Sequence, residues 1–173
     1  MTRQREHQRG FTLTELMVTI TVVAVLASIA IGLSAGARGA DTPVELGNMD
    51  AQRDWGFAGD YVEGMWRMLQ QDKADDYVLA TGVTTSIRDF FTYAAEALGL
   101  NPDWQGEGHE EIAVDRKSGR QLMRVNPKFY RPAEVELLIG DASKARTQLG
   151  WEPRVGVREL AEMMARADYD ALA

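Results

Sequence analysis

Two arginines and the acidic residues beside them are the side chains of this sequence whose type and spacing come closest to a chemical site. Arg53 is followed directly by Asp54, and Arg131 stands three positions before Glu134. A guanidinium group this close to a carboxylate can form a local ion pair on a turn, and exposed pairs of this kind contribute about 0–1 kcal/mol to stability. By spacing alone, the sequence favours two local ion pairs over a binding site.

Cysteine and histidine, which carry much of nucleophilic and metal chemistry, are almost absent. The 173 residues contain no cysteine and two histidines, His7 and His109. This composition excludes a cysteine nucleophile, a disulfide framework and a thiolate zinc site, and it argues against a histidine metal site. The net charge of −7 argues against a surface that binds the backbone of nucleic acid. We therefore expect no metal site and no nucleic-acid partner.

The elements that must position the polar residues are predicted from residue 46 onward, where the composition is globular. Apolar periodicity, capping residues and turn signals alternate between helices and strands, which predicts an α/β fold without a full set of parallel strands. The predicted helices cover residues 60–71, 86–98, 141–149 and 159–167, and the predicted strands cover residues 76–80, 104–106, 112–116, 121–125 and 135–139.

The stretch from Phe11 to Leu33 is apolar apart from one charge, that of Glu15. As a helix it would be about 34 Å long, enough to cross the core of a bilayer. We therefore predict a transmembrane helix, and the arginines before it predict a single-pass inner-membrane orientation with the rest of the chain outside the cytoplasm. Residues 1–33 then form a leader and transmembrane helix, residues 34–45 a flexible linker, and residues 46–173 the globular region.

The segment Arg9-Gly10-Phe11-Thr12-Leu13-Thr14-Glu15 resembles the start of a type IV prepilin or pseudopilin. This resemblance implies cleavage between Gly10 and Phe11 and methylation of Phe11. A lone carboxylate in lipid is costly without a partner, and the resemblance implies that Glu15 meets the N-terminal amine of a neighbouring subunit during assembly. The alternative is an ordinary signal anchor in which Glu15 lies near the membrane interface.

A second and longer resemblance covers residues 46–168. The segments that carry it are LGNMDAQRDWG at 46–56, DYVEGMW at 60–66, YVLATG at 77–82 and RPAEVELLIGD at 131–141, with KA at 144–145 and LGW at 149–151. They resemble the C-terminal substrate-binding part of the GDP-mannose 4,6-dehydratase family of extended short-chain dehydrogenases/reductases. The resemblance implies an incomplete C-terminal part of such an enzyme, with the Rossmann sheet missing.

The resemblance to the dehydratases also implies binding residues. Arg53 and Arg131 stand at the positions that hold the diphosphate of the nucleotide sugar in that family, a task that suits the guanidinium fork. Glu134 matches the residue that accepts hydrogen bonds from the ribose hydroxyls, and Asn48 is a candidate near the sugar or the nucleotide. For both arginines, the resemblance favours a binding role over a local ion pair.

The catalytic parts that the resemblance implies are not in this sequence. The family's chemistry needs NADP, bound by a Gly-x-x-Gly-x-x-Gly loop, and a catalytic Tyr-x-x-x-Lys pair. None of the five tyrosines is followed by lysine four positions on, and Gly32, Gly36 and Gly39 lack the spacing of the loop. We therefore predict no catalytic residue and no cofactor site in this chain, with weak binding of GDP-mannose or GDP.

Three functions stay open on the sequence: a truncated, inactive dehydratase, a type IV pilin or pseudopilin-like membrane subunit made by a gene fusion, and a nucleotide-sugar-binding module that completes an active site with a partner. The dehydratase family works in the cytoplasm, whereas an inserted helix would export the globular region. Phe90 and Phe91 belong to the predicted buried face of the helix over residues 86–98. Without the Rossmann sheet, however, the apolar faces around Val62, Trp66, Phe90 and Phe91 are expected to be left partly exposed and to favour homo-oligomers or other association.

Overall fold

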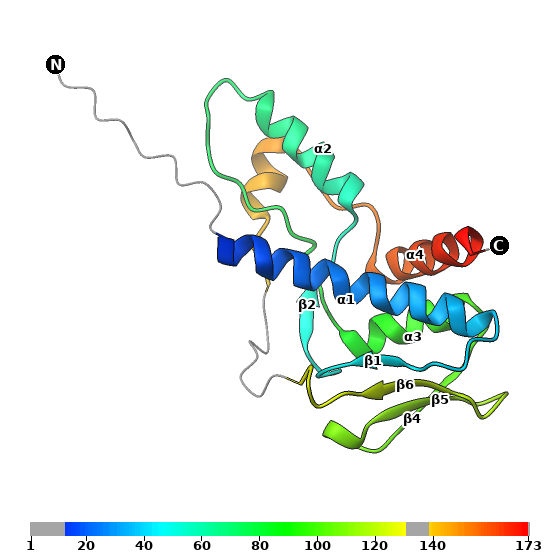
Figure 1. Ribbon diagram of the computed structural model, residues 1–173. Coiled ribbons are helices and arrows are strands. Elements are labelled where there is room, and N and C mark those ends of the chain that lie inside the picture. Colours follow the sequence, from blue (N-terminus) through cyan, green and yellow to red (C-terminus); the bar gives the residue numbers. More distant parts are fainter. Residues whose placement is uncertain (1–12, 131–138, 173) are drawn as a thin grey trace.

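The computed structural model describes residues 13–130 and 139–172, and it describes side chains from residue 24 onward. A sheet with three helices on one face forms the larger part, and a smaller helical part lies beside it (Figure 1). In chain order the elements are α1 (Leu13–Ala37), β1 (Val44–Leu46), β2 (Gln52–Asp54), α2 (Ala58–Leu69), β3 (Thr84–Ser86), α3 (Ile87–Ala97), β4 (Pro102–Gln105), the short turn η1 (Gly108–Glu110), β5 (Ile112–Asp115), β6 (Gln121–Val125), the π-helical turn η2 (Ala145–Leu149) and α4 (Val157–Ala171).

The larger sheet contains four strands in the order β1-β6-β5-β4. β1 runs parallel to β6, with Val44 opposite Met123, and the other neighbours are antiparallel. The predicted hairpin of β5 and β6 is confirmed, and its turn contains Gly119 at a φ of 71°, a left-handed conformation that glycine adopts without strain. β2 and β3 form a separate antiparallel pair.

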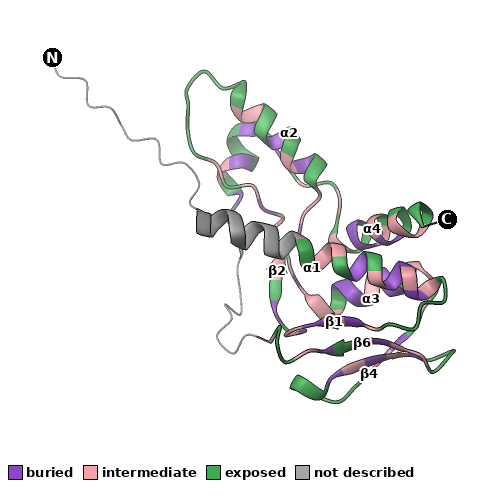
Figure 2. Ribbon diagram, viewed as in Figure 1, coloured by how far each residue is buried: buried purple, intermediate pink, exposed green. Residues whose placement is uncertain are grey.

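Helices α1, α3 and α4 pack together over the larger sheet and enclose the main core, which Figure 2 shows in purple on their facing sides. Phe90 and Phe91 of α3 are fully buried in it. The expectation that the face around these two residues is left partly exposed is wrong, because α1 and α4 cover α3. Val62 and Trp66 of α2 are exposed, so the expected partial exposure of an apolar face holds for this helix.

The ends of α3 follow from the residues at its boundaries. The Ser86 hydroxyl accepts a hydrogen bond from the Asp89 backbone N–H at 3.0 Å and donates one to the Asp89 carboxylate at 2.7 Å. This satisfies one of the N–H groups that the first turn of a helix leaves open. Gly99 follows the helix at a φ of 75°. The predicted start and end of this helix are confirmed to within two residues.

The smaller part of the molecule joins α2 to the segment around η2. Trp151 is almost fully buried there with Ala145 and Leu149. The Trp151 indole Nε1–H donates to the Asp60 carbonyl at 2.7 Å, and the buried Asp60 carboxylate accepts hydrogen bonds from the N–H groups of Arg154 and Val155. Polar contacts therefore fix the start of α2 to the chain that leads into α4.

The predicted strand over residues 76–80 is not a strand in the structure. These residues are irregular, because no strand among the described residues lies beside them to complete a ladder. Most of the predicted strand over residues 135–139 lies outside the described residues.

The structure differs from the prediction of a membrane-spanning helix over residues 11–33. Among the residues that the structure describes, no helix is long and apolar enough to cross a membrane. Ile29 and Leu33 of α1 pack instead in the main core, at exposed fractions of 0% and 1%. The apolar residues of this part of the segment are thus accounted for by burial against protein.

The predicted linker over residues 34–45 is also structured in part. α1 continues to Ala37, and the buried Ser34 hydroxyl donates to the Ala165 carbonyl of α4 at 3.0 Å. Val44 and Glu45 belong to strand β1. The helix and the sheet therefore meet closely, and Val44 lies against Gly32.

The packing of α1 predicts that the same substitution, isoleucine to valine, changes the free energy of unfolding differently at two positions of this helix. Ile29→Val is expected to lower the free energy of unfolding by about 1 kcal/mol, because it removes a methyl group from a packed core. Ile31→Val should change it by less than about 0.5 kcal/mol, because Ile31 is 52% exposed. Urea unfolding followed by tryptophan fluorescence measures both. Equal values for the two variants would contradict the core role of α1.

Candidate functional site

A hollow of about 300 Å³ is the best candidate site in the described part of the chain. It lies between β2, the first turns of α2 and two irregular segments at residues 78–80 and 139–140. Its polar side chains are Arg53, Asp54 and Tyr61, and its remaining lining residues are Trp55, Val78, Leu79, Ala80, Ile139 and Gly140. Mostly apolar walls with a few polar groups are typical of small-molecule sites.

Strand pairing sets the position of Arg53. It is the central residue of β2, opposite Thr85 of β3, and its Nη1 donates to the Gln52 carbonyl at 2.7 Å. The next residue, Trp55, donates from its indole nitrogen to the Thr85 carbonyl at 3.1 Å and lies against Phe90 of the main core. Pairing with β3 therefore holds the backbone of Arg53 in place, and the residue lines the hollow.

The carboxylate of Asp54 fixes one wall of the hollow. One of its oxygens accepts hydrogen bonds from the Thr81 N–H at 3.0 Å and the Thr81 hydroxyl at 2.6 Å, and the other accepts one from the Gly82 N–H at 2.8 Å. Gly82 has a φ of 78°, which favours glycine in this turn. Asp54 thus holds the turn that follows residues 78–80 against β2.

Tyr61 contributes a hydroxyl group to the hollow. Its half-buried ring stacks on Trp151 with 6.1 Å between the centroids. Burial raises the pKa of the Tyr61 hydroxyl above its ordinary value of 10.0, and the carboxylates of Asp54 and Asp60 raise that pKa further. The phenol is therefore neutral at physiological pH and can donate a hydrogen bond.

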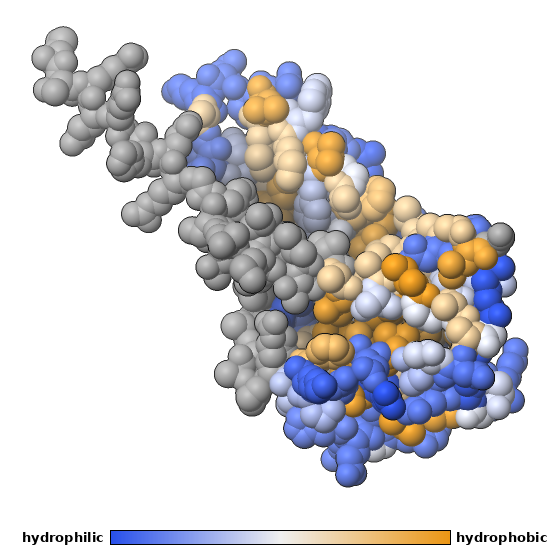
Figure 3. Space-filling view, in the orientation of Figure 1, coloured by the Kyte–Doolittle hydropathy of each residue, from blue (hydrophilic) through white to orange (hydrophobic). Residues whose placement is uncertain are grey.

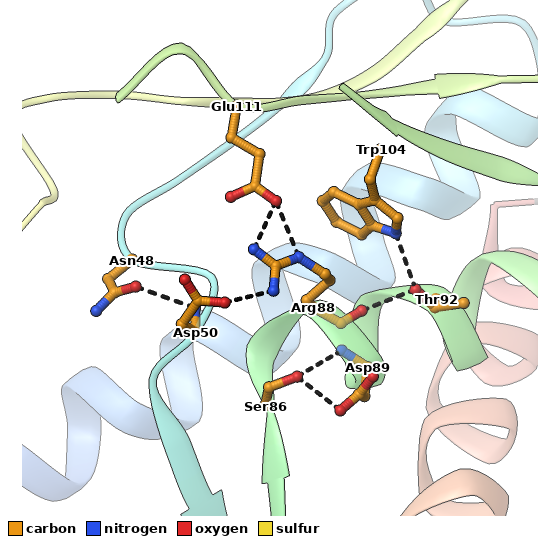
Figure 4. A network of polar contacts seen from close by, with 8 residues as sticks. All are labelled: Asn48, Asp50, Ser86, Arg88, Asp89, Thr92, Trp104 and Glu111. Atoms are coloured by element: carbon orange, nitrogen blue, oxygen red, sulfur yellow. Dashed lines mark hydrogen bonds and ion pairs between the residues drawn. The ribbon is translucent and has the colours of Figure 1, made fainter. Parts of the chain in front are cut away.

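The structure places Asn48 outside this hollow, in the turn that leads from β1 toward β2. Its side-chain oxygen accepts a hydrogen bond from the Asp50 N–H at 3.0 Å. Figure 4 shows that the Arg88 guanidinium bridges Asp50 and the buried Glu111 carboxylate, with 2.7 Å between Arg88 Nη2 and Glu111 Oε1. The Arg88 N–H also donates to the Met49 carbonyl. The first turn of α3 therefore holds the turn that carries Asn48.

A second hollow, of about 430 Å³, is lined by Trp55, Thr81, Val83 and residues 153–158. Both of its arginines already have carboxylate partners: Arg154 pairs with Glu63, and Arg158 pairs with Glu96 at 2.9 Å. These pairs reduce the positive charge that the second hollow offers to an anion.

Several predicted site residues lie outside the described residues. Arg131 and Glu134 are among them, as are Gly10 and Phe11 of the predicted cleavage site. Glu15 belongs to α1, but the structure does not describe its side chain. Binding by Arg131 and Glu134, cleavage after Gly10 and the assembly role of Glu15 stay predictions.

Sequence reasoning missed Tyr61 as a site residue. Tyr61 lies eight positions after Arg53, in the first turn of the predicted helix, and a helix that starts directly behind a strand brings its first side chains close to that strand. This signal was available in the spacing. Trp55 is buried in the core and also lines both hollows.

Solved structures share this architecture. RMD of Pseudomonas aeruginosa, solved in complex with NADPH, matches 86% of this chain and 43% of its own length with a TM-score of 0.66 at 18% identity. UDP-glucose 4-epimerase of Thermotoga maritima, solved with UDP-glucose, matches 84% of this chain and 40% of its own length with a TM-score of 0.60 at 22% identity. The fold is therefore an α/β fold of the class found in the short-chain dehydrogenase/reductase epimerases and dehydratases.

Sequence comparison defines the family within that class. Residues 17–164 match the family model of GDP-mannose 4,6 dehydratase. The GDP-mannose 4,6-dehydratase of Sinorhizobium fredii is 54% identical over 127 residues, which are 73% of this chain and 36% of that protein, and the Drosophila melanogaster relative is 48% identical over 74% of this chain and 32% of that protein. The chain belongs to the GDP-mannose 4,6-dehydratase family.

The predicted resemblance to the GDP-mannose 4,6-dehydratase family is confirmed. The family model begins at Met17, inside the segment predicted to span a membrane. Most of α1 thus belongs to the dehydratase match. The chain spans about a third of the length of the two curated relatives named above.

Proposed function

We propose that this chain is the nucleotide-sugar-binding part of a GDP-mannose 4,6-dehydratase. The observation that carries the proposal is the hollow beside Arg53, formed by segments that the family match covers. An arginine among the lining residues of a mostly apolar hollow suits a ligand that joins a phosphate group to a ring. GDP-mannose, which the relatives' name specifies, is such a ligand.

In this proposal Arg53 and Arg131 hold the diphosphate. A guanidinium group donates two parallel hydrogen bonds to paired phosphate oxygens, and these charge-assisted bonds are roughly twice as strong as neutral ones. Glu134 accepts hydrogen bonds from the ribose hydroxyls. Asn48 does not line the hollow, and its place near the sugar or the nucleotide stays a prediction.

The residues of this chain do not fit the NADP cofactor that the family's chemistry requires. The sequence holds no Gly-x-x-Gly-x-x-Gly loop after a strand and no Tyr-x-x-x-Lys pair. The chain therefore supplies binding without the groups that would oxidise the sugar or move its protons. We assign it no catalytic residue.

An exposed apolar face supports a partner for this module. Val62, Met65, Trp66 and Leu69 are all exposed on α2, and Figure 3 shows apolar side chains gathered over this helix. Their spacing of three and four residues puts them on one side of the helix. A second polypeptide that covers this face would bring cofactor and catalytic residues to the sugar.

The proposal is tested by measuring binding and turnover together. The full chain is expected to bind GDP in titration calorimetry and, with GDP-mannose and NADP, to form no 4-keto-6-deoxy sugar. The intact Sinorhizobium fredii relative is the positive control for the assay. Product formed by this chain, after purification from a host that lacks its own dehydratase, would contradict the assignment of a binding role alone.

A further inference from the structure

The hydroxyl group of Tyr61 is the polar atom of the hollow whose role the proposed function does not explain. Among the described residues it neither donates nor accepts a hydrogen bond. In the described part of the chain, every fully buried side-chain oxygen or nitrogen has a hydrogen-bond partner. Since the Tyr61 oxygen has none there, it is in contact with solvent. Within the described ranges, the Tyr61 oxygen is therefore accessible and has no hydrogen-bond partner in a hollow whose walls are mostly apolar.

The surroundings hold this hydroxyl in one place. The ring is stacked on Trp151, whose indole is itself bonded to the Asp60 carbonyl. The oxygen rests against the backbone of Gly56, where a Cβ atom would come within 2.2 Å of it. A side chain that is already restricted to one conformation loses little conformational entropy when a ligand binds.

The charges near Tyr61 determine which kind of ligand group can bind to its hydroxyl. The carboxylates of Asp54 and Asp60 both act on its hydroxyl, so a phosphate at this point would face two negative charges. A neutral hydroxyl group would not be repelled by these carboxylates. The apolar walls at Val78 and Leu79 suit the carbon faces of a sugar ring. Arg53, at the same hollow, provides the cationic group that a phosphate needs.

We propose that the Tyr61 hydroxyl binds a hydroxyl group of the hexose, so that the hollow separates the two ends of the ligand: Arg53 recognises the diphosphate and Tyr61 recognises the sugar. This assignment rests on the proposed function of the site.

Replacing Tyr61 by phenylalanine tests the assignment, because the ring and its stacking on Trp151 are kept and a single oxygen is removed. Titration calorimetry on the full chain should show that Tyr61→Phe weakens GDP-mannose binding roughly three- to tenfold and leaves GDP binding unchanged. Tyr77→Phe is the matched control, since the Tyr77 hydroxyl bonds to Gln148 at 3.1 Å and its side chain does not line the hollow.

Three results would overturn the assignment. Equal weakening of GDP and GDP-mannose by Tyr61→Phe would place the hydroxyl on the nucleotide. Unchanged GDP-mannose affinity, with GDP still bound, would remove Tyr61 from the site and leave the proposed function standing. Failure of the unaltered chain to bind either ligand would overturn the proposed function and this assignment together.

Discussion

Arg88→Met is expected to lower the free energy of unfolding by about 3 kcal/mol. The Glu111 side chain is only 7% exposed, and in the unaltered chain two nitrogens of Arg88 donate to one of its oxygens, at 2.9 and 2.7 Å. Removing the arginine leaves a buried carboxylate without its counter-charge, which costs about 3–5 kcal/mol when a fully buried pair is broken. Because Arg88 itself is 31% exposed, we expect the lower end of that range.

Two further variants separate the buried charge from the loss of packing. The double variant Arg88→Met, Glu111→Leu should recover most of the lost stability, because it removes both charges and keeps apolar volume. Arg116→Met breaks the exposed Arg116–Asp103 pair and should cost less than about 1 kcal/mol. Chemical unfolding gives all three values. A double variant as unstable as Arg88→Met would show that the contact of Arg88 with the Trp104 ring, rather than the charge of Glu111, dominates.

Arg53→Ala is expected to weaken GDP binding about tenfold to a hundredfold. Loss of a hydrogen bond between charged groups costs about 1.5–3 kcal/mol, which corresponds to that range in the dissociation constant. The GDP affinity of Arg53→Lys should lie between those of the unaltered chain and Arg53→Ala, because lysine keeps the positive charge and loses the two parallel N–H donors of the guanidinium group. The affinity of the unaltered chain should also fall as salt is added, since phosphate contacts of an accessible arginine are screened. Titration calorimetry at two salt concentrations measures each effect.

A matched charge control is available on α4. Arg166 is exposed, and Arg166→Ala changes the net charge by the same amount as Arg53→Ala without altering the hollow. If the two variants weakened GDP binding equally, the effect would come from net charge and the assignment of Arg53 to the diphosphate would fail. Unfolding curves of Arg53→Ala show whether β2 and β3 stay paired in the absence of this side chain.

Local signals in the sequence were sufficient for the elements whose boundaries depend on neighbouring residues. The start of α3 follows from Ser86 and Asp89, and the β5–β6 hairpin follows from the turn at residues 117–120. The family, too, was readable from the motifs in residues 46–151, since 54% identity to a relative preserves them in order. Arg53 could be nominated on that basis, because the motif fixes its position in the chain.

The same local signals failed where a residue's partner lies far away in the sequence. Residues 76–80 have the composition of a strand, but a strand needs a neighbour, and none of the described strands pairs with them. The face around Phe90 and Phe91 was expected to be left partly exposed without the Rossmann sheet. It is buried, because α1, more than fifty residues earlier in the chain, packs over α3.

The apolar run at the N-terminus shows the limit most clearly. Hydropathy measures how unfavourable water is for Ile29 and Leu33, and it does not say whether lipid or protein replaces the water. In the structure, α3 and α4 provide that environment. The site follows the same rule: the sequence determined which residue types are present and which family they belong to. Only the tertiary structure decided that Tyr61 shares a hollow with Arg53, because the packing of α2 beside β2 brings their side chains together.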